Sequence, residues 1–130
     1  LHLEEGEHRV RSFALNVGGT RLLGQGVGSI ALLARLGDDA LVAHYRRHEA
    51  EYQADDVGLA RLRRWAVQTR DCGHSYGSSG GVAGIGLGFR VGSCADAALS
   101  VIAPRSRLPR SRGAELALAM RREMGAWRLL

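Results

Sequence analysis

The segment Gly80–Pro109, GGVAGIGLGFRVGSCADAALSVIAPRSRLP, decides the fold of this chain. It contains two apolar runs, Val82–Phe89 and Ala95–Ala103, separated by the polar turn Arg90–Cys94. Apolar runs of this length, joined by a short polar connection, predict a β-hairpin. Glycine weakens a strand, so the repeated glycines of the first run indicate that another group approaches its backbone closely.

One face of this predicted hairpin carries small side chains. Side chains alternate along a strand, so Ala98, Ser100 and Ile102 of the second run share a face. With the glycine-rich first run they predict half of a pocket, with a floor of small residues, accessible backbone and one hydroxyl.

The residues before the hairpin predict a strand, a loop and a helix. Arg9–Asn16 alternates loosely and fits a strand, with Val10 and Phe13 as its larger apolar residues. The glycine-rich stretch Val17–Gly28 leads into the apolar run Ile30–Ala34, which predicts a loop followed by a helix. The first N–H groups of a helix are free to bind carboxylate or phosphate.

Three further helices complete the predicted architecture. The first is expected at residues 40–49, capped by Asp38 and Asp39. The second is capped by Asp55 and Asp56 and ended by Gly73, with Leu59, Leu62, Trp65, Ala66 and Thr69 near helical spacing. The third is expected near Arg112–Leu129, with a buried stripe of Leu116, Met120, Met124 and Trp127. Cys72–Ser79 is predicted to be a loop. Sequential strands joined by a hairpin, with helices around them, predict an antiparallel sheet with helices packed on it, an α+β fold.

Composition narrows the class of protein. A chain of 130 residues fits one domain, and 45% hydrophobic with 24% charged residues is globular and not disordered. No apolar stretch has the length of a membrane span, and two cysteines indicate a reducing cytoplasm. All 18 basic residues are arginine, so the lysine of a nucleotide-binding P-loop is missing. The net charge of +5 alone is a poor indicator of a nucleic-acid partner.

Several short motifs follow one another in an order known from one protein family. They are Arg70-Asp71-Cys72-Gly73-His74, Gly81-Val82-Ala83-Gly84-Ile85-Gly86, Ala97-Ala98-Leu99-Ser100-Val101, Pro104 and Ser106-Arg107-Leu108. Upstream, residues 19–34 are similar to the glycine-bearing loop and the following helix of that family. From about Arg9 to its end, the chain resembles the C-terminal effector-binding domain of IclR-family bacterial transcription regulators.

This resemblance implies a GAF-like fold, a curved antiparallel sheet flanked by helices. In the family a winged helix-turn-helix domain precedes this region, so residues 1–130 are expected to be an effector-binding domain that is incomplete at its N-terminus. The implied partners are a small organic acid, further copies in a homodimer or homotetramer, and DNA only through the missing domain. No catalysis, cofactor, metal or membrane is expected.

Carried across by position, the resemblance implies one effector pocket. Its residues are Val10, Phe13, Val27, Gly28, His74, Val82, Gly84, Ser100 and Ile102. The amides near Gly28 and the hydroxyl of Ser100 suit a carboxylate. Ile30 stands where the family often has Lys, Ile102 where it often has Ser, and Ala103 where it has Gly. We therefore expect the effector to be more hydrophobic than a two-carbon keto acid; an aromatic acid would fit.

Other interpretations stay open beside this one. Cys72 with His74, or Cys94, would suit a GAF-like redox enzyme of the methionine sulfoxide reductase type, although ordinary loop residues are the simpler interpretation. A third interpretation is a domain whose only role is dimerisation. His44 and His48 stand four apart, as zinc ligands can, but HExxH is absent and solvated histidines are favoured.

The arginines at 105, 107, 110 and 112 form a basic patch without interleaved aromatic residues. Such a patch is more typical of a solvated face or a subunit contact than of a nucleic-acid surface.

Overall fold

The computed structural model describes residues 18–127. Its elements are, in order, α1 (Val27–Leu33), α2 (Asp38–Arg47), α3 (Glu49–Ala54), α4 (Leu59–Cys72), β1 (Ser75–Ser79), β2 (Val82–Val91), β3 (Ala95–Pro104), the short 3-10 helix η1 (Arg105–Arg107) and α5 (Arg110–Ala126). The predicted α+β class is confirmed. The predicted strand Arg9–Asn16, with Val10 and Phe13, lies outside the described residues.

The described strands form one antiparallel sheet in the order β1-β2-β3. The predicted hairpin is confirmed, with β2 and β3 paired from Val82 opposite Pro104 to Val91 opposite Ala95. The expectation of a loop at Cys72–Ser79 is wrong, because Ser75–Ser79 pairs with β2. Apart from Tyr76 the strand consists of serine and glycine, which lack the β-branched pattern of a strand, and the ladder with β2 makes it one.

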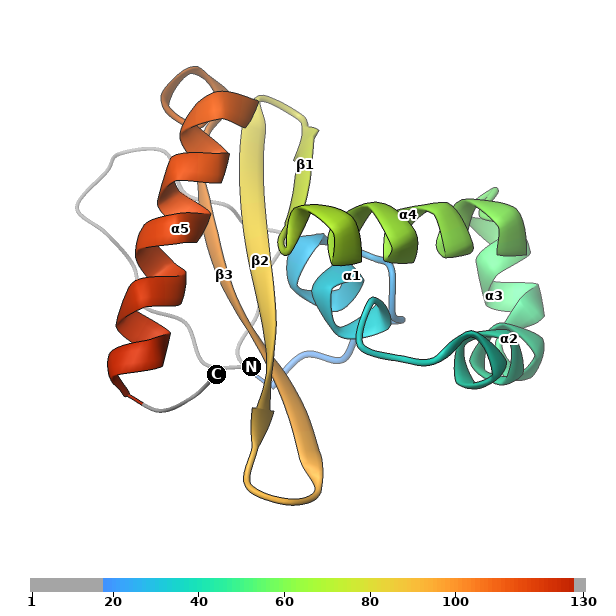
Figure 1. The fold of residues 1–130 in the computed structure, drawn as a ribbon. Helices are drawn as coiled ribbons and strands as arrows, with labels where there is room; N and C mark the ends of the chain where they lie inside the picture. Colours follow the sequence, from blue (N-terminus) through green and yellow to red (C-terminus); the bar gives the residue numbers. More distant parts are fainter. Residues whose placement is uncertain (1–17, 128–130) are drawn as a thin grey trace.

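Helices cover both faces of this sheet (Figure 1). Helix α5 packs on one face, where Ile85 and Leu87 of β2 form a core with Ala117, Met120 and Met124. Helix α1 packs on the other face and contacts all three strands. Helix α4 runs outward from α1, with α2 and α3 at its far end (Figure 1), and we call these three helices the helical arm. Below, the two faces are the α5 face and the α1 face.

The alternation of β2 explains why its two faces differ. Ala83, Ile85 and Leu87 are buried, and they alternate with glycines at 84, 86 and 88. A Cβ atom at Gly86 would lie 2.5 Å from the carbonyl oxygen of Val27, and one at Gly88 would lie 2.8 Å from that of Ala31. The close approach indicated by the sequence is therefore made by the backbone of α1.

Two helix starts differ from the sequence expectation. Gly37 caps α2 and Gly58 caps α4, and neither helix has a side-chain capping hydrogen bond. Asp38 and Asp39 lie instead in the first turn of α2, where a negative charge favours the helix dipole. The predicted end of α4 is confirmed, because Gly73 takes the left-handed conformation with φ 78°.

A second core holds the arm together and includes a helix that the sequence did not predict. It consists of Leu33, Leu41, Tyr45, Tyr52, Leu62 and Ala66, from α1 to α4. Helix α3 contributes only Tyr52 to it, so its six residues carry no apolar periodicity.

In α5, Met120 and Met124 are buried as predicted, but Trp127 is 76% exposed, so its place in the buried stripe is wrong. It follows the last helical residue as the C-cap. Within residues 18–127, no helix combines the length and apolar character that a membrane span requires.

Candidate functional site

Six of the nine predicted pocket residues lie on or against the α1 face of the sheet. Strand pairing places Gly84 opposite Ile102 and Gly86 opposite Ser100. Val82 has the same strand parity as these glycines, so its side chain belongs to that face. Val27 and Gly28 are the first two residues of α1.

The start of α1 sits directly on this floor. A Cβ atom at Gly28 would lie 2.5 Å from the Oγ of Ser100 and 3.8 Å from the Cβ of Ala98. The side chain of Val27 packs in the space that two glycines leave open. A Cβ atom at Gly84 would lie 3.0 Å from the Cγ2 of Val27, and a Cβ atom at Gly77 would lie 3.3 Å from its Cγ1. Val27 and Gly84 are buried, whereas Ser100 is exposed. The accessible part of the predicted site is therefore the line along β3 where Ser100 meets α1.

Hydrogen bonds fix the position of this helix start. The Oγ of Ser75 donates to the carbonyl of Val27 at 2.5 Å, and the Oγ of Ser29 donates to the carbonyl of Gly26 at 3.1 Å. The amide of Ile30 donates to the same Gly26 carbonyl at 2.9 Å and closes the first turn. The amides that precede Ile30 in α1 are the ones that have no partner within the helix.

An ion pair holds the other end of α1 to β3. The Nε of Arg35 lies 2.8 Å from a carboxylate oxygen of Asp96, and Arg90 lies 3.4 Å from the same oxygen. The hydrogen bond from Arg35 lowers the pKa of Asp96 below its ordinary value, and the charges of both arginines act in the same direction. Helix α1 is thus tied to the sheet at both ends.

The structure does not bring His74 to this site. His74 precedes β1 and follows Gly73, whose carbonyl accepts a hydrogen bond from Arg121 of α5, the helix on the other face of the sheet. Burial is the main cause that lowers the pKa of His74, and the charges of Arg121 and Arg110 on α5 add to it, partly opposed by a hydrogen bond to the backbone of Cys72. Val10 and Phe13 lie outside the described residues.

The two cysteines are free, exposed and on different elements. Cys72 is the last residue of α4, and Cys94 lies in the turn between β2 and β3. The hydrogen bond between His74 and Cys72 goes to the backbone of Cys72. That contact is not the thiol–imidazole pair that the redox interpretation requires.

Two hollows lie elsewhere on the described part of the molecule, and neither is lined by the nine predicted residues. An apolar groove of about 720 Å³ between β3 and α5 is lined by Leu99, Leu116, Ala119, Met120, Arg122, Glu123, Met124 and Trp127. A polar hollow of about 410 Å³ beside the arm is lined by Thr20, Arg21, Leu22, Leu23, Gln25, His44, His48 and Glu51. The sequence indicated only part of each lining: Leu116, Met120, Met124 and Trp127 of the groove, and His44 and His48 of the polar hollow.

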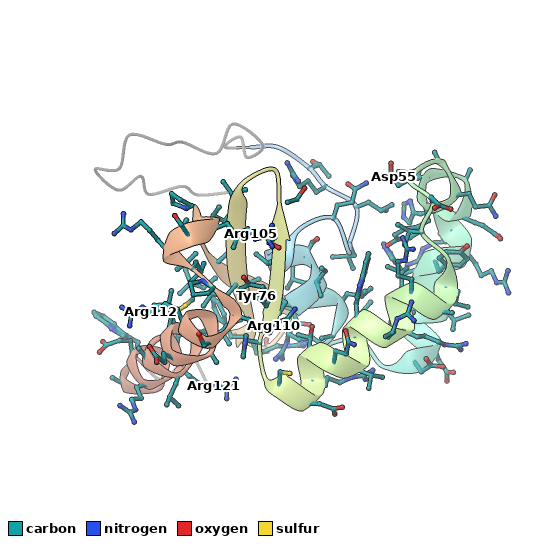
Figure 2. The ribbon with its side chains drawn as sticks, turned by 90° about the horizontal axis from the view of Figure 1, so that it is seen from above. Asp55, Tyr76, Arg105, Arg110, Arg112 and Arg121 are labelled. Carbon is teal, nitrogen blue, oxygen red and sulfur yellow. The ribbon has the colours of Figure 1, made fainter. Side chains whose placement is uncertain are left out.

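The basic patch surrounds the start of α5 (Figure 2). The guanidinium of Arg110 lies 4.6 Å from the ring centre of Tyr76, and Arg112 pairs with Glu115 at 3.0 Å. The Tyr76 hydroxyl donates to the carbonyl of Leu108 at 2.9 Å. The side chains of Arg110 and Arg112 therefore make contacts within the domain.

Two solved structures share this fold. The repressor BlcR from Agobacterium tumefaciens, an IclR-family regulator, matches with a TM-score of 0.62 and 23% identity, over 78% of this chain and 44% of that one. The C-terminal domain of a protein described as a transcriptional regulator from Vibrio cholerae matches with a TM-score of 0.63 and 24% identity, over 88% of this chain and 69% of that one. No protein-family model matches the sequence, and no curated protein matches it closely. The chain spans less than half the length of BlcR, and what it shares with both structures is the fold of a domain of transcriptional regulators.

Proposed function

We propose that this chain is the effector-binding domain of an IclR-type transcriptional regulator, with a GAF-like fold, and that it binds a small organic acid without transforming it. The regulator would act in the cytoplasm as a homodimer or homotetramer and contact DNA through a separate domain. The observation that carries this proposal is the contact between the start of α1 and Ser100 on a floor of glycines. The fold shared with BlcR and the Vibrio domain supports the same class.

The chemistry of this contact suits a carboxylate. The first amides of α1 offer N–H groups, and the exposed hydroxyl of Ser100 lies beside them. Ile102 follows on the same face of β3 and offers apolar surface to the rest of the ligand. A site with few polar groups and apolar surroundings is typical of small-molecule binding. We therefore propose an aromatic or other apolar acid as the effector.

Calorimetric titration with benzoate and with glyoxylate tests this proposal. We expect benzoate to bind more tightly, and Ser100→Ala to weaken its binding about tenfold, as loss of one hydrogen bond to a charged group does. The matched control is Ser78→Ala. Ser78 is an exposed serine of β1 that pairs with Ala83, so its side chain lies on the α5 face of the sheet, away from Ser100.

Equal affinity of wild type and Ser100→Ala for benzoate would show that the effector does not bind at the contact between Ser100 and α1. If neither acid bound, the effector chemistry would be refuted. A preference for glyoxylate would contradict the hydrophobic effector alone.

A further inference from the structure

The polar hollow beside the helical arm contains two imidazoles close to each other. His44 lies in the last turn of α2 and His48 is the residue that caps that helix. Their ring centres are 4.8 Å apart, and both rings line the hollow. The proposed effector site does not include them, so their arrangement needs its own explanation.

Hydrogen bonds define which nitrogen of His44 carries the proton. The hydroxyl of Tyr52 has one hydrogen and donates it to the carbonyl of Leu23 at 2.6 Å. In its 3.0 Å contact with the Nε2 of His44, the Tyr52 oxygen must therefore accept. The Nε2 of His44 is the donor, and the Nδ1 of the neutral ring keeps its lone pair.

The same reasoning defines the tautomer of His48. Its Nδ1 lies 2.9 Å from the Oε1 of Glu51, and an ionised carboxylate only accepts hydrogen bonds. The Nδ1 of His48 therefore carries the hydrogen, and its Nε2 keeps the lone pair. A histidine that binds a metal typically donates its other N–H to a carboxylate or another oxygen, which fixes the ring. Both histidines have that partner.

The spacing of the rings also agrees with one shared ion. With a metal–nitrogen distance of about 2.1 Å, each ring centre would lie about 3.2 Å from the ion, so two rings at a right angle would be about 4.5 Å apart and at a tetrahedral angle about 5.2 Å. The observed separation of 4.8 Å falls between these values.

We propose that the Nδ1 of His44 and the Nε2 of His48 bind one divalent transition-metal ion, with water in the remaining positions. Two neutral imidazoles select copper, nickel or zinc over magnesium or calcium. Among residues 18–127, no group of three or more histidine, cysteine or acidic side chains is placed to hold a metal. The site therefore has two protein ligands, and its affinity is moderate. It is independent of the proposed effector site.

Titration with Cu²⁺, followed by electron paramagnetic resonance, tests the site directly. The protein used is residues 1–130 with Cys72→Ser, Cys94→Ser, His2→Ala and His8→Ala, because these side chains bind copper on their own. We expect one ion per chain with the hyperfine pattern of two imidazole nitrogens. His44→Gln and His48→Gln should each weaken the binding about tenfold or more and remove one nitrogen.

The choice of glutamine keeps the test independent of folding. In His44→Gln the new side-chain amide still supplies an N–H for Tyr52, and circular dichroism verifies the fold of each variant. The matched control is His74→Gln, which changes the one other histidine among the described residues and should leave copper binding unchanged.

Unchanged affinity in both His44→Gln and His48→Gln would refute the site. So would a spectrum without two coordinated imidazoles, or no binding at about 1 mM Cu²⁺, which corresponds to about 4 kcal/mol.

Discussion

Gly28 and Ser100 lie against each other, so that a Cβ atom added to Gly28 would meet the Oγ of Ser100 at 2.5 Å. The two residues are 72 positions apart and belong to α1 and β3. Their contact joins the first amides of α1, which have no partner within the helix, to the only serine side chain of β3. The candidate carboxylate site is therefore a junction between two elements and not a space enclosed by one loop.

Gly86→Ala should destabilise the domain by about 3 kcal/mol, because the new methyl group overpacks a contact that cannot yield. Its Cβ would lie 2.5 Å from the carbonyl oxygen of Val27, and that atom belongs to the backbone of α1. Chemical denaturation measures the loss. The control is Gly125→Ala in α5, where the new Cβ would meet no atom within 4 Å apart from its chain neighbours and the backbone of its own helix, and alanine should stabilise the helix by about 1 kcal/mol. A stable Gly86→Ala variant would show that α1 does not pack on β2 as described.

Gly28→Ala should change the free energy of unfolding by less than about 1 kcal/mol, although the new Cβ would lie 2.5 Å from its nearest neighbour, as at Gly86. The gain in helix propensity offsets the cost of moving the Ser100 side chain. Here the opposing atom is a hydroxyl that rotation of the Ser100 side chain moves away. The variant should nevertheless lose affinity for benzoate, since the hydroxyl then leaves the junction. Titration and denaturation of the same sample separate the two effects. An affinity equal to that of wild type would contradict the proposed role of Ser100.

Met124→Ala should lower the free energy of unfolding by about 2–4 kcal/mol, whereas Trp127→Ala should change it by less than about 1 kcal/mol. Met124 is 3% exposed in the core between α5 and the sheet, and Trp127 is 76% exposed. Thermal unfolding of the two variants compares them. A large loss for Trp127→Ala would restore the buried stripe expected from the sequence.

Asp96→Asn should lower stability at neutral pH and have progressively less effect as the solution becomes acidic. The pKa of Asp96 is lowered in the folded state by its hydrogen bond to Arg35. Its contribution is therefore fully present above the ordinary carboxyl pKa of about 3.9 and is lost as pH falls through the lower folded value. Urea denaturation of both proteins between neutral pH and about pH 3 measures this convergence. Asp71→Asn, an exposed position in the last turn of α4 where a negative charge does not favour the helix dipole, is the control. A difference between wild type and Asp96→Asn that did not shrink in acid would contradict the ion pair.

The sequence predicted the elements whose pattern is local. The hairpin of β2 and β3 follows from two apolar runs and a turn, and the end of α4 follows from a glycine that accepts the left-handed conformation. It did not predict β1 or α3. Ser75–Ser79 is a strand only because β2 pairs with it, and Glu49–Ala54 is a helix with one buried side chain.

The candidate site was predicted in part. Strand alternation places Gly84, Ser100 and Ile102 on one face, and the structure agrees. His74 lies just before β1 and close to Arg110 and Arg121 of α5, which the sequence did not reveal while Cys72–Ser79 was expected to be a loop. The ring orientations of His44 and His48 depend on Tyr52 and Glu51, which no spacing rule supplies.

The sequence by itself determined which residues have no side chain, and so where backbones are able to meet. The tertiary structure alone decided what meets them, because the partner of Gly86 is the carbonyl of Val27, 59 positions earlier in the chain. Local patterns record the preferences of neighbouring residues, whereas contacts between distant residues depend on how complete helices and strands pack.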